Sequence, residues 1–295
     1  MNLLKLIRKA TVRLLMIIVA LSCFSCQEND AIVQSLFDLS GASLIYDDSN
    51  AGRHLKVVAV SMTCSKDKGA NLDRICSKAI EAKNRHPEAE LILFGESVLG
   101  WYIDDEHPEP YQRSIAESIP GPATDSVAII AETLGCHIGF GLTETNHSKL
   151  YNSFVLVDPE GEIVATHRKV NLAPEDILGG ITPAAEIDSS VTMVRINNIK
   201  VGMIICADAN GVWLTRELTE RGVEVMLHPM ASEVPMFRID AGSRQFNAWE
   251  VFANRYGEEL GRQYSGTTFI ADPSGCIRIG DSGKEGFYFY NIGVN

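Results

Sequence analysis

Residues 200–229 read KVGMIICADANGVWLTRELTERGVEVMLHP, and this stretch sets the class of fold. KVGMIICAD (200–208) is an apolar run of strand length, and VWLTRELTERG (212–222) has the apolar spacing of a helix. VEVMLHP (223–229) is a second apolar run rich in β-branched residues. A strand, a helix and a strand in succession are typical of a layered α/β domain.

The rest of the chain continues this alternation from about residue 55 to residue 295. The patterns predict strands at 56–62, 90–96, 136–144, 191–196 and 287–292, helices at 70–85, 124–135 and 241–255, and hairpins at 151–169 and 265–280. Pro-Glu-Gly and Asp-Pro-Ser-Gly are the turn sequences of the two hairpins. We therefore expect one α/β or α+β domain with a mixed sheet over 55–295.

Three polar residues stand at the carboxyl ends of predicted strands. Glu96 ends LILFGE, Lys169 ends VATHRK, and Cys206 interrupts GMIICAD. Sites in open sheets form beyond the carboxyl ends of strands. Taken singly, a Glu or Lys at a strand end is usually solvated, and a Cys in such a run is usually part of the core.

Together the three residues make a complete acyl-transfer site without histidine. A cysteine thiolate is a strong nucleophile towards an acyl carbon. A carboxylate with a raised pKa can take the proton of the thiol, and a lysine ammonium can stabilise the oxyanion that forms.

At this point the sequence resembles the nitrilase (carbon–nitrogen hydrolase) superfamily. Five segments resemble the motifs of that family in order, at 91–102, 166–175, 200–213, 251–257 and 265–275. The resemblance covers nearly the whole predicted domain. It implies an α-β-β-α sandwich, commonly paired through a helix face into larger homo-oligomers.

The resemblance also implies roles for individual residues. Cys206 is expected to be the nucleophile, Glu96 the general base and then acid, and Lys169 the oxyanion stabiliser. The backbone N–H of Ala207 is expected to be a second oxyanion donor. Family members carry a further Glu after the Lys, for which Glu175 is the best match and Glu186 the alternative.

The sequence departs from the family pattern around the predicted pocket. Gly95 stands where the family usually has Pro, and Ala207 stands where an aromatic residue usually follows the Cys. These departures leave the chemistry intact but prevent an inference of the substrate. Core packing and strand-end positions are equally good readings for the candidate substrate-binding residues, which are Trp101, Tyr102, Asn210, Trp213, His228 and Met230.

Residues 1–26 have the pattern of an export signal. Four basic residues and no acidic one precede or flank the apolar run LLMIIVALS (14–22), which is short for a membrane span. The run ends in CFSC (23–26), which resembles the lipobox of bacterial lipoproteins. We expect lipidation at Cys26, with Cys23 as the alternative, a tether over 27–54, and an exported protein anchored at the outer membrane or cell surface. An uncleaved anchor or a plain signal peptide is the competing interpretation.

Composition narrows the function classes. The net charge is −12, and because four of the 26 basic residues and none of the 38 acidic ones lie in residues 1–26, residues 27–295 carry −16. A nucleic-acid partner is therefore not expected. Seven cysteines are too sparse for a disulfide scaffold, and the seven histidines lack metal-ligand spacing, so neither a metal nor another cofactor is expected.

The sequence thus predicts a lipid-anchored hydrolase of non-peptide C–N bonds, of the amidase type, acting on a small-molecule amide. A nitrilase acting on nitriles and an N-carbamoyl amide hydrolase are the enzymatic alternatives. A catalytically silent relative that binds a small ligand on the same scaffold is the alternative from another class.

Overall fold

The computed structural model describes residues 46–104, 106–184, 191–234 and 247–295. The predicted export signal with Cys26, the first part of the predicted tether and Glu186 lie outside these residues. Across the described residues no helix is long and apolar enough to cross a membrane. Tyr46 already packs edge-on against Trp249, with ring centroids 5.6 Å apart, so the folded part begins before the first strand.

In the first sheet, Glu96 and Lys169 follow the carboxyl ends of two strands. Its strands are β1 (Arg53–Thr63), β2 (Leu91–Leu93), β3 (His137–Asn146), β4 (Lys149–Val157), β5 (Ile163–Arg168) and β13 (Gly286–Val294). The order is β5-β4-β3-β2-β1, with β13 antiparallel to β1. β1, β2 and β3 are parallel, whereas β4 and β5 form the predicted hairpin.

The second sheet carries the cysteine. Its strands are β6 (Met193–Ile196), β7 (Ile199–Met203), β8 (Val225–Met230), β9 (Trp249–Glu259), β10 (Arg262–Ser265), β11 (Thr268–Ala271) and β12 (Ile277–Asp281). β7, β8 and β9 are parallel neighbours. β1 pairs with β9 where Met62 lies opposite Arg255, so the two sheets join into one 13-stranded sheet.

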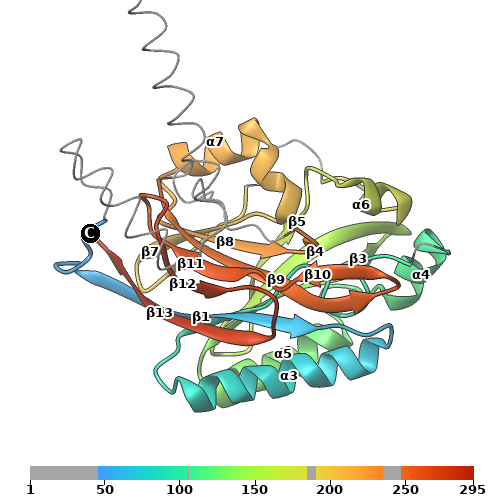
Figure 1. Ribbon diagram of the computed structural model, residues 1–295, viewed down its shortest axis with the longest axis horizontal. Helices are drawn as coiled ribbons and strands as arrows, with labels where there is room; N and C mark the ends of the chain where they lie inside the picture. The colour runs from blue at the N-terminus through green and yellow to red at the C-terminus, as the bar shows by residue number, and fades with distance from the viewer. Residues whose placement is uncertain (1–45, 105, 185–190, 235–246) are drawn as a thin grey trace, which may run out of the picture. The chain divides into compact units, whose positions relative to one another are not determined.

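Helices cover both outer faces, which gives the four layers in Figure 1. The helices α3 (Lys68–Arg85) and α5 (Pro122–Leu134) pack on the first sheet, and α7 (Val212–Glu220) packs on the second. The short helices α4 (Pro108–Ile115), α6 (Pro174–Leu178) and the 3-10 turn η2 (Cys206–Asn210) lie in connections. The predicted mixed α/β sandwich is confirmed.

The alternation of β1 shows how the sequence builds these layers. Leu55, Val57 and Ala59 belong to the core between the two sheets, whereas Val58 and Val60 pack in the core under α3 and α5. Successive side chains of a strand point to opposite faces, so a strand covered on both sides is continuously apolar.

One predicted helix is wrong. Residues 249–255 of the predicted helix 241–255 form the first part of β9, and residues 241–246 lie outside the described residues. Trp249, Val251 and Ala253 face the core between the sheets, and Phe252 faces a separate cluster with Phe269. Because both faces are buried, the apolar run has no alternation that separates strand from helix, and pairing with β8 and β11 decides.

Two strands end well before their predicted carboxyl ends, and this matters for the site. β2 ends at Leu93 and β7 at Met203, so Glu96 and Cys206 lie on the connections beyond the strand ends. The sequence patterns also did not predict α4, α6 or β10.

Candidate active site

A buried cluster of charged side chains lies where β2 and β5 end. The Nζ atom of Lys169 is 2.6 Å from Oε1 of Glu96, and both side chains have no exposed surface. The thiol of Cys206, which begins η2, interacts electrostatically with both groups. The structure therefore brings together the three residues that the sequence places at strand ends.

Asp176 and Asn152 complete this cluster. Nζ of Lys169 is also 2.6 Å from Oδ2 of Asp176, the third residue of α6. Nδ2 of Asn152, on β4, donates to Oε1 of Glu96 at 2.7 Å and to Oδ1 of Asp176 at 2.9 Å. The lysine thus bridges two carboxylates, and one amide holds both carboxylates in place.

One oxygen of Glu96 is left over. Among the described residues, Oε2 of Glu96 has no hydrogen-bond partner although the side chain is fully buried. A buried carboxylate oxygen without a partner costs free energy, on the order of 1–3 kcal/mol or more. Such an atom is available to accept a proton from a neighbouring group.

Burial changes the proton affinities in the cluster. It raises the pKa of the Glu96 carboxyl, an effect that the ammonium of Lys169 opposes. Burial disfavours the charge on Lys169, but the negative charges of Glu96, Cys206 and Asp176 outweigh it and raise the pKa of this lysine. Burial and then the charge of Glu96 raise the pKa of the Cys206 thiol. A neutral thiol beside a carboxylate of raised pKa is the arrangement that general-base activation of a nucleophile requires.

The backbone at Cys206 forms a strained elbow. Its φ is +45°, a left-handed value that non-glycine residues seldom adopt. The backbone amide of Ala231 donates to the thiol, and the Cys206 carbonyl lies 3.1 Å from Nε2 of His228. The peptide that follows leads to Ala207, which is partly exposed.

Asp208 ties the cysteine elbow to the lysine strand. Its Oδ2 accepts from the backbone N–H of Ile205 at 3.0 Å and lies 2.9 Å from Nε2 of His167. Its Oδ1 accepts from the backbone amides that follow Lys169, at Val170 and Asn171. Burial opposes the charge, but these hydrogen bonds lower the pKa of Asp208.

Arg255 and Glu259, on β9, hold the loop that carries Glu96. Nη2 of Arg255 donates to the Gly100 carbonyl at 2.6 Å, and Nη1 donates to the Ser97 carbonyl at 3.3 Å. Oε2 of Glu259 accepts from the backbone N–H of Tyr102 at 2.9 Å. This buried ion pair therefore fixes residues on both sides of the turn after Glu96.

Close packing against β3 fixes the same loop from the other side. A Cβ atom on Gly141 would lie 2.5 Å from the backbone nitrogen of Ser97 and 2.9 Å from Cα of Glu96. No side chain fits at that position without moving the loop. Gly141 therefore lets β3 lie directly against the loop that carries Glu96.

The other candidate residues are distributed unevenly. The hydroxyl of Tyr102 is 3.3 Å from Nζ of Lys169, so Tyr102 lies in the cluster. The ring of Trp101 lies against Tyr111 and Lys66 instead. The carbonyl of Met230 accepts from the Glu96 backbone N–H at 3.3 Å.

Two further candidates, Asn210 and Trp213, are exposed around the start of α7. The polar partners of Lys169 Nζ are Glu96, Asp176 and Tyr102, and Glu175 is not among them. Its carboxylate, 27% exposed, pairs with Nη1 of Arg262 at 3.2 Å. The catalytic role assigned to Glu175 stays a prediction, and Asp176 is the carboxylate that the structure places on the lysine.

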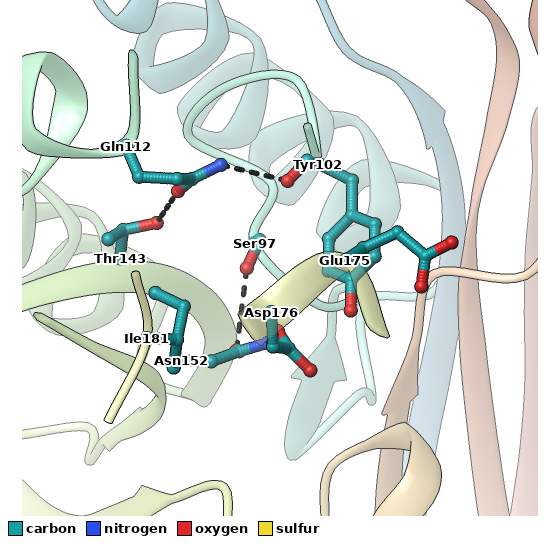
Figure 2. A pocket seen from close by; sticks show the side chains of 8 residues that line it. All are labelled: Ser97, Tyr102, Gln112, Thr143, Asn152, Glu175, Asp176 and Ile181. Carbon is teal, nitrogen blue, oxygen red and sulfur yellow. Dashed lines mark hydrogen bonds between the residues drawn. The ribbon is translucent and has the colours of Figure 1, made fainter. Parts of the chain in front are cut away.

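A small pocket adjoins the cluster on the side of Asn152 and Asp176 (Figure 2). Its lining is mostly polar and consists of Ser97, Tyr102, Gln112, Thr143, Asn152, Glu175, Asp176 and Ile181. Gln112 crosses its upper part, donating to the Tyr102 carbonyl and accepting from Thr143. The Glu175 carboxylate points away from Asn152 and Ser97 in this view.

Comparison with known proteins identifies the family. The model of the carbon-nitrogen hydrolase family matches residues 56–285. The chain belongs to the carbon–nitrogen hydrolase family. Every residue of the cluster lies within the matched range.

Individual relatives of this family are distant. A hydrolase of Schizosaccharomyces pombe is 28% identical over 232 residues, which cover 76% of this chain and 66% of the relative. The omega-amidase NIT2 of Xenopus tropicalis is 28% identical over 177 residues, 58% of this chain and 62% of the relative. The chain thus spans slightly less than two thirds of these relatives.

A solved structure of an amidase from Nesterenkonia sp. AN1 has the same fold. The TM-score is 0.71 at 20% identity, and the match covers 82% of this chain and 91% of the amidase. That amidase is a mutant with the acetamide moiety of fluoroacetamide added covalently at its active-site cysteine.

Sequence reasoning missed the residues that hold the cluster. Asn152 stands inside the apolar strand YNSFVLV (151–157), and a polar residue at a buried strand position was a usable signal. Asp208, two residues after the cysteine, was available in the same way. Asp176 was missed because the family pattern calls for a Glu after the Lys, and the neighbouring Glu175 met that expectation.

Proposed function

We propose that the protein is an amidase-type hydrolase that cleaves non-peptide C–N bonds through a cysteine thioester. The observation that carries this proposal is the fully buried Glu96: one of its oxygens has no partner among the described residues, while Lys169 and Asn152 hold the other. This oxygen belongs to a group that interacts with the Cys206 thiol. Family membership supports the same reaction class.

The first half of the reaction forms a thioester. Sγ of Cys206 attacks the amide carbonyl carbon while Glu96 accepts the thiol proton. The oxyanion is stabilised by the ammonium of Lys169 and by the backbone N–H of Ala207. The C–N bond then breaks as Glu96 returns the proton to the leaving nitrogen, which departs as ammonia or an amine.

The second half regenerates the enzyme. Glu96, again ionised, takes a proton from a water molecule whose oxygen attacks the thioester carbon. The C–S bond breaks, the sulfur regains a proton from Glu96, and a carboxylic acid leaves. No step requires a cofactor.

The substrate class we favour is a small aliphatic amide. The omega-amidase relatives and the amidase carrying an acetamide moiety at its cysteine support this choice. Nitriles and N-carbamoyl compounds are the alternatives that the same chemistry serves.

The test is turnover by the full-length chain. Ammonia release is measured on a panel of aliphatic amides, nitriles and N-carbamoyl amines, beside Cys206→Ala as the matched control. We expect release from at least one amide and none from the variant. If no compound is turned over and no electrophile labels Cys206, the protein is a silent ligand-binding relative.

We also propose that the protein is exported and lipid-anchored through Cys26. The basic segment, the short apolar run and CFSC (23–26) support this proposal. Labelled palmitate should appear on the full chain expressed in a Gram-negative host and be lost in Cys26→Ala. Loss of the label in Cys23→Ala instead would assign the lipidation to Cys23. Assembly into homo-oligomers is proposed from the family resemblance, and light scattering tests it.

A further inference from the structure

A buried His–Glu pair lies directly behind the nucleophile and has no part in the mechanism above. His228, on β8, is 3% exposed, and Glu250, on β9, is 1% exposed. Nδ1 of His228 is 2.7 Å from Oε1 of Glu250, and Nε2 is 3.1 Å from the carbonyl oxygen of Cys206. Both ring nitrogens are therefore occupied by protein atoms and neither is offered to a substrate.

Donor and acceptor counting fixes what the ring does. A carbonyl oxygen only accepts, so the contact with Cys206 requires a hydrogen on Nε2. On the other side, either Nδ1 donates to the ionised Glu250, or the protonated Glu250 donates to Nδ1. In both forms the pair holds the same total number of protons, and Nε2–H donates to the carbonyl.

The peptide group that receives this hydrogen bond joins Cys206 to Ala207. A trans peptide is planar, and its C=O and N–H bonds point in opposite directions. Holding the Cys206 carbonyl towards His228 therefore directs the Ala207 N–H away from His228. The φ of +45° at Cys206 is seldom adopted by non-glycine residues, so this orientation needs external support.

The surroundings strengthen the hydrogen bond. The ring of Phe252 packs edge-on against His228 at 5.0 Å, and Phe269 stacks on Phe252 at 4.5 Å. An apolar wall lowers the local dielectric constant, and hydrogen bonds in sequence polarise one another. A donor at the carbonyl oxygen makes the N–H of the same peptide a better donor.

We propose that His228, oriented by Glu250, is a positioning residue that fixes and polarises the Cys206–Ala207 peptide so that the Ala207 N–H can stabilise the oxyanion. This role rests on the proposed function, because it presupposes acyl transfer at Cys206. It also replaces the substrate contact that the sequence suggested for His228.

Two reactions of the same thiol separate this role from a general effect. Acyl transfer from p-nitrophenyl acetate passes through an oxyanion and needs the donor. Alkylation by iodoacetamide displaces iodide at a CH₂ carbon, where no charge develops on a carbonyl oxygen. A residue that serves only the oxyanion donor should affect the first reaction and leave the second unchanged.

The experiment uses the full-length chain and two variants that differ in reach. In His228→Gln the side-chain amide can take the place of Nε2 and donate to the Cys206 carbonyl. In His228→Asn the amide takes the place of Nδ1 and falls short of that carbonyl. The measurements are p-nitrophenolate release and the rate of Cys206 alkylation by mass spectrometry, beside Cys206→Ala, with thermal unfolding as the folding control.

We expect His228→Asn to slow acyl transfer about 10- to 100-fold, below the loss for deleting a whole oxyanion donor, because the N–H is misdirected rather than removed. Alkylation should stay within about twofold, and His228→Gln should recover most of the acyl transfer. Equal losses in both reactions, or no loss in acyl transfer, would overturn the positioning role of His228 and leave the proposed function standing. If wild-type Cys206 neither releases p-nitrophenolate nor is alkylated, the proposed function falls, and this role falls with it.

Discussion

Two buried ion pairs lie on either side of the loop 96–102, and they differ in one respect. Lys169 pairs with Glu96 at 2.6 Å. Arg255 pairs with Glu259, and both of these residues lie on β9. Burial raises the pKa of both glutamates, and in both cases the neighbouring cation opposes it. Similar electrostatics therefore do not distinguish a reactive pair from a structural one.

Hydrogen-bond satisfaction does distinguish them. Both oxygens of Glu259 are used, one by Arg255 and the other by the backbone N–H of Tyr102. Among the described residues, Oε2 of Glu96 has no partner. The Arg255–Glu259 pair is thus expected to contribute stability to the loop, and the Lys169–Glu96 pair to keep an acceptor ready for chemistry.

The largest expected effect comes from exchanging the reactive carboxylate. Glu96→Gln should lower kcat/KM by at least about 10³-fold, because an amide cannot accept the thiol proton. Hydrolysis is measured on an amide that the wild type turns over. The matched variant is Glu259→Gln, which should reduce the free energy of unfolding more than Glu96→Gln does. A residual activity above one tenth in Glu96→Gln would contradict the distinction between the pairs.

The next effect concerns stability. Arg255→Met should cost about 3–5 kcal/mol of the free energy of unfolding, because it leaves Glu259 buried and without its cation. The measurement is urea denaturation followed by fluorescence. The double variant Arg255→Met with Glu259→Leu should recover a substantial part of the loss, since no charge is then left uncompensated. A double variant less stable than the single one would contradict this expectation, because Glu259 would then stabilise the loop even without its cation.

The contrast between these pairs also explains what sequence could predict. The clustering of Glu96, Lys169 and Cys206 could be predicted because each interrupts an apolar strand end, which is a local signal. The layers followed from the apolar patterns of β1 and α3 in the same way. Asp176 and Arg255 were missed because their roles depend on contacts made only after distant segments meet. The helix predicted over 241–255 failed for the related reason that pairing of β9 overrides an ambiguous local pattern.

A smaller effect is expected where one group couples the two halves of the site. Asp208→Asn replaces one of the two carboxylate oxygens by an NH₂ group, which donates hydrogen bonds. Either the acceptor for the Ile205 amide or the acceptor for the Val170 and Asn171 amides is then lost. We expect kcat to fall about 10- to 100-fold, because misplacing catalytic groups slightly is costly, with a stability loss of about 1–3 kcal/mol. The readouts are single-turnover acylation and urea denaturation. Unchanged acylation with reduced stability would show that Asp208 supports only the fold.

The smallest expected effect is a shift of the pH–rate profile, and it tests the contribution of Asp176, the second carboxylate of the cluster. Glu96, the proposed base, can accept a proton only when it is ionised, and burial raises its pKa above the ordinary value of 4.5. The rate must therefore rise with pH along a limb that lies above 4.5, and this limb belongs to the coupled cluster as a whole. The negative charge of Asp176 contributes to the elevation, so Asp176→Asn should move the limb to lower pH, by less than about one pH unit. Among the described residues, no second carboxylate contributes to the raised pKa of Glu259, so Glu259→Gln should leave the limb in place. The profile is measured as log kcat/KM between pH 4 and pH 9, and a limb that moves upward in Asp176→Asn would show that losing the hold on Lys169 outweighs losing the charge.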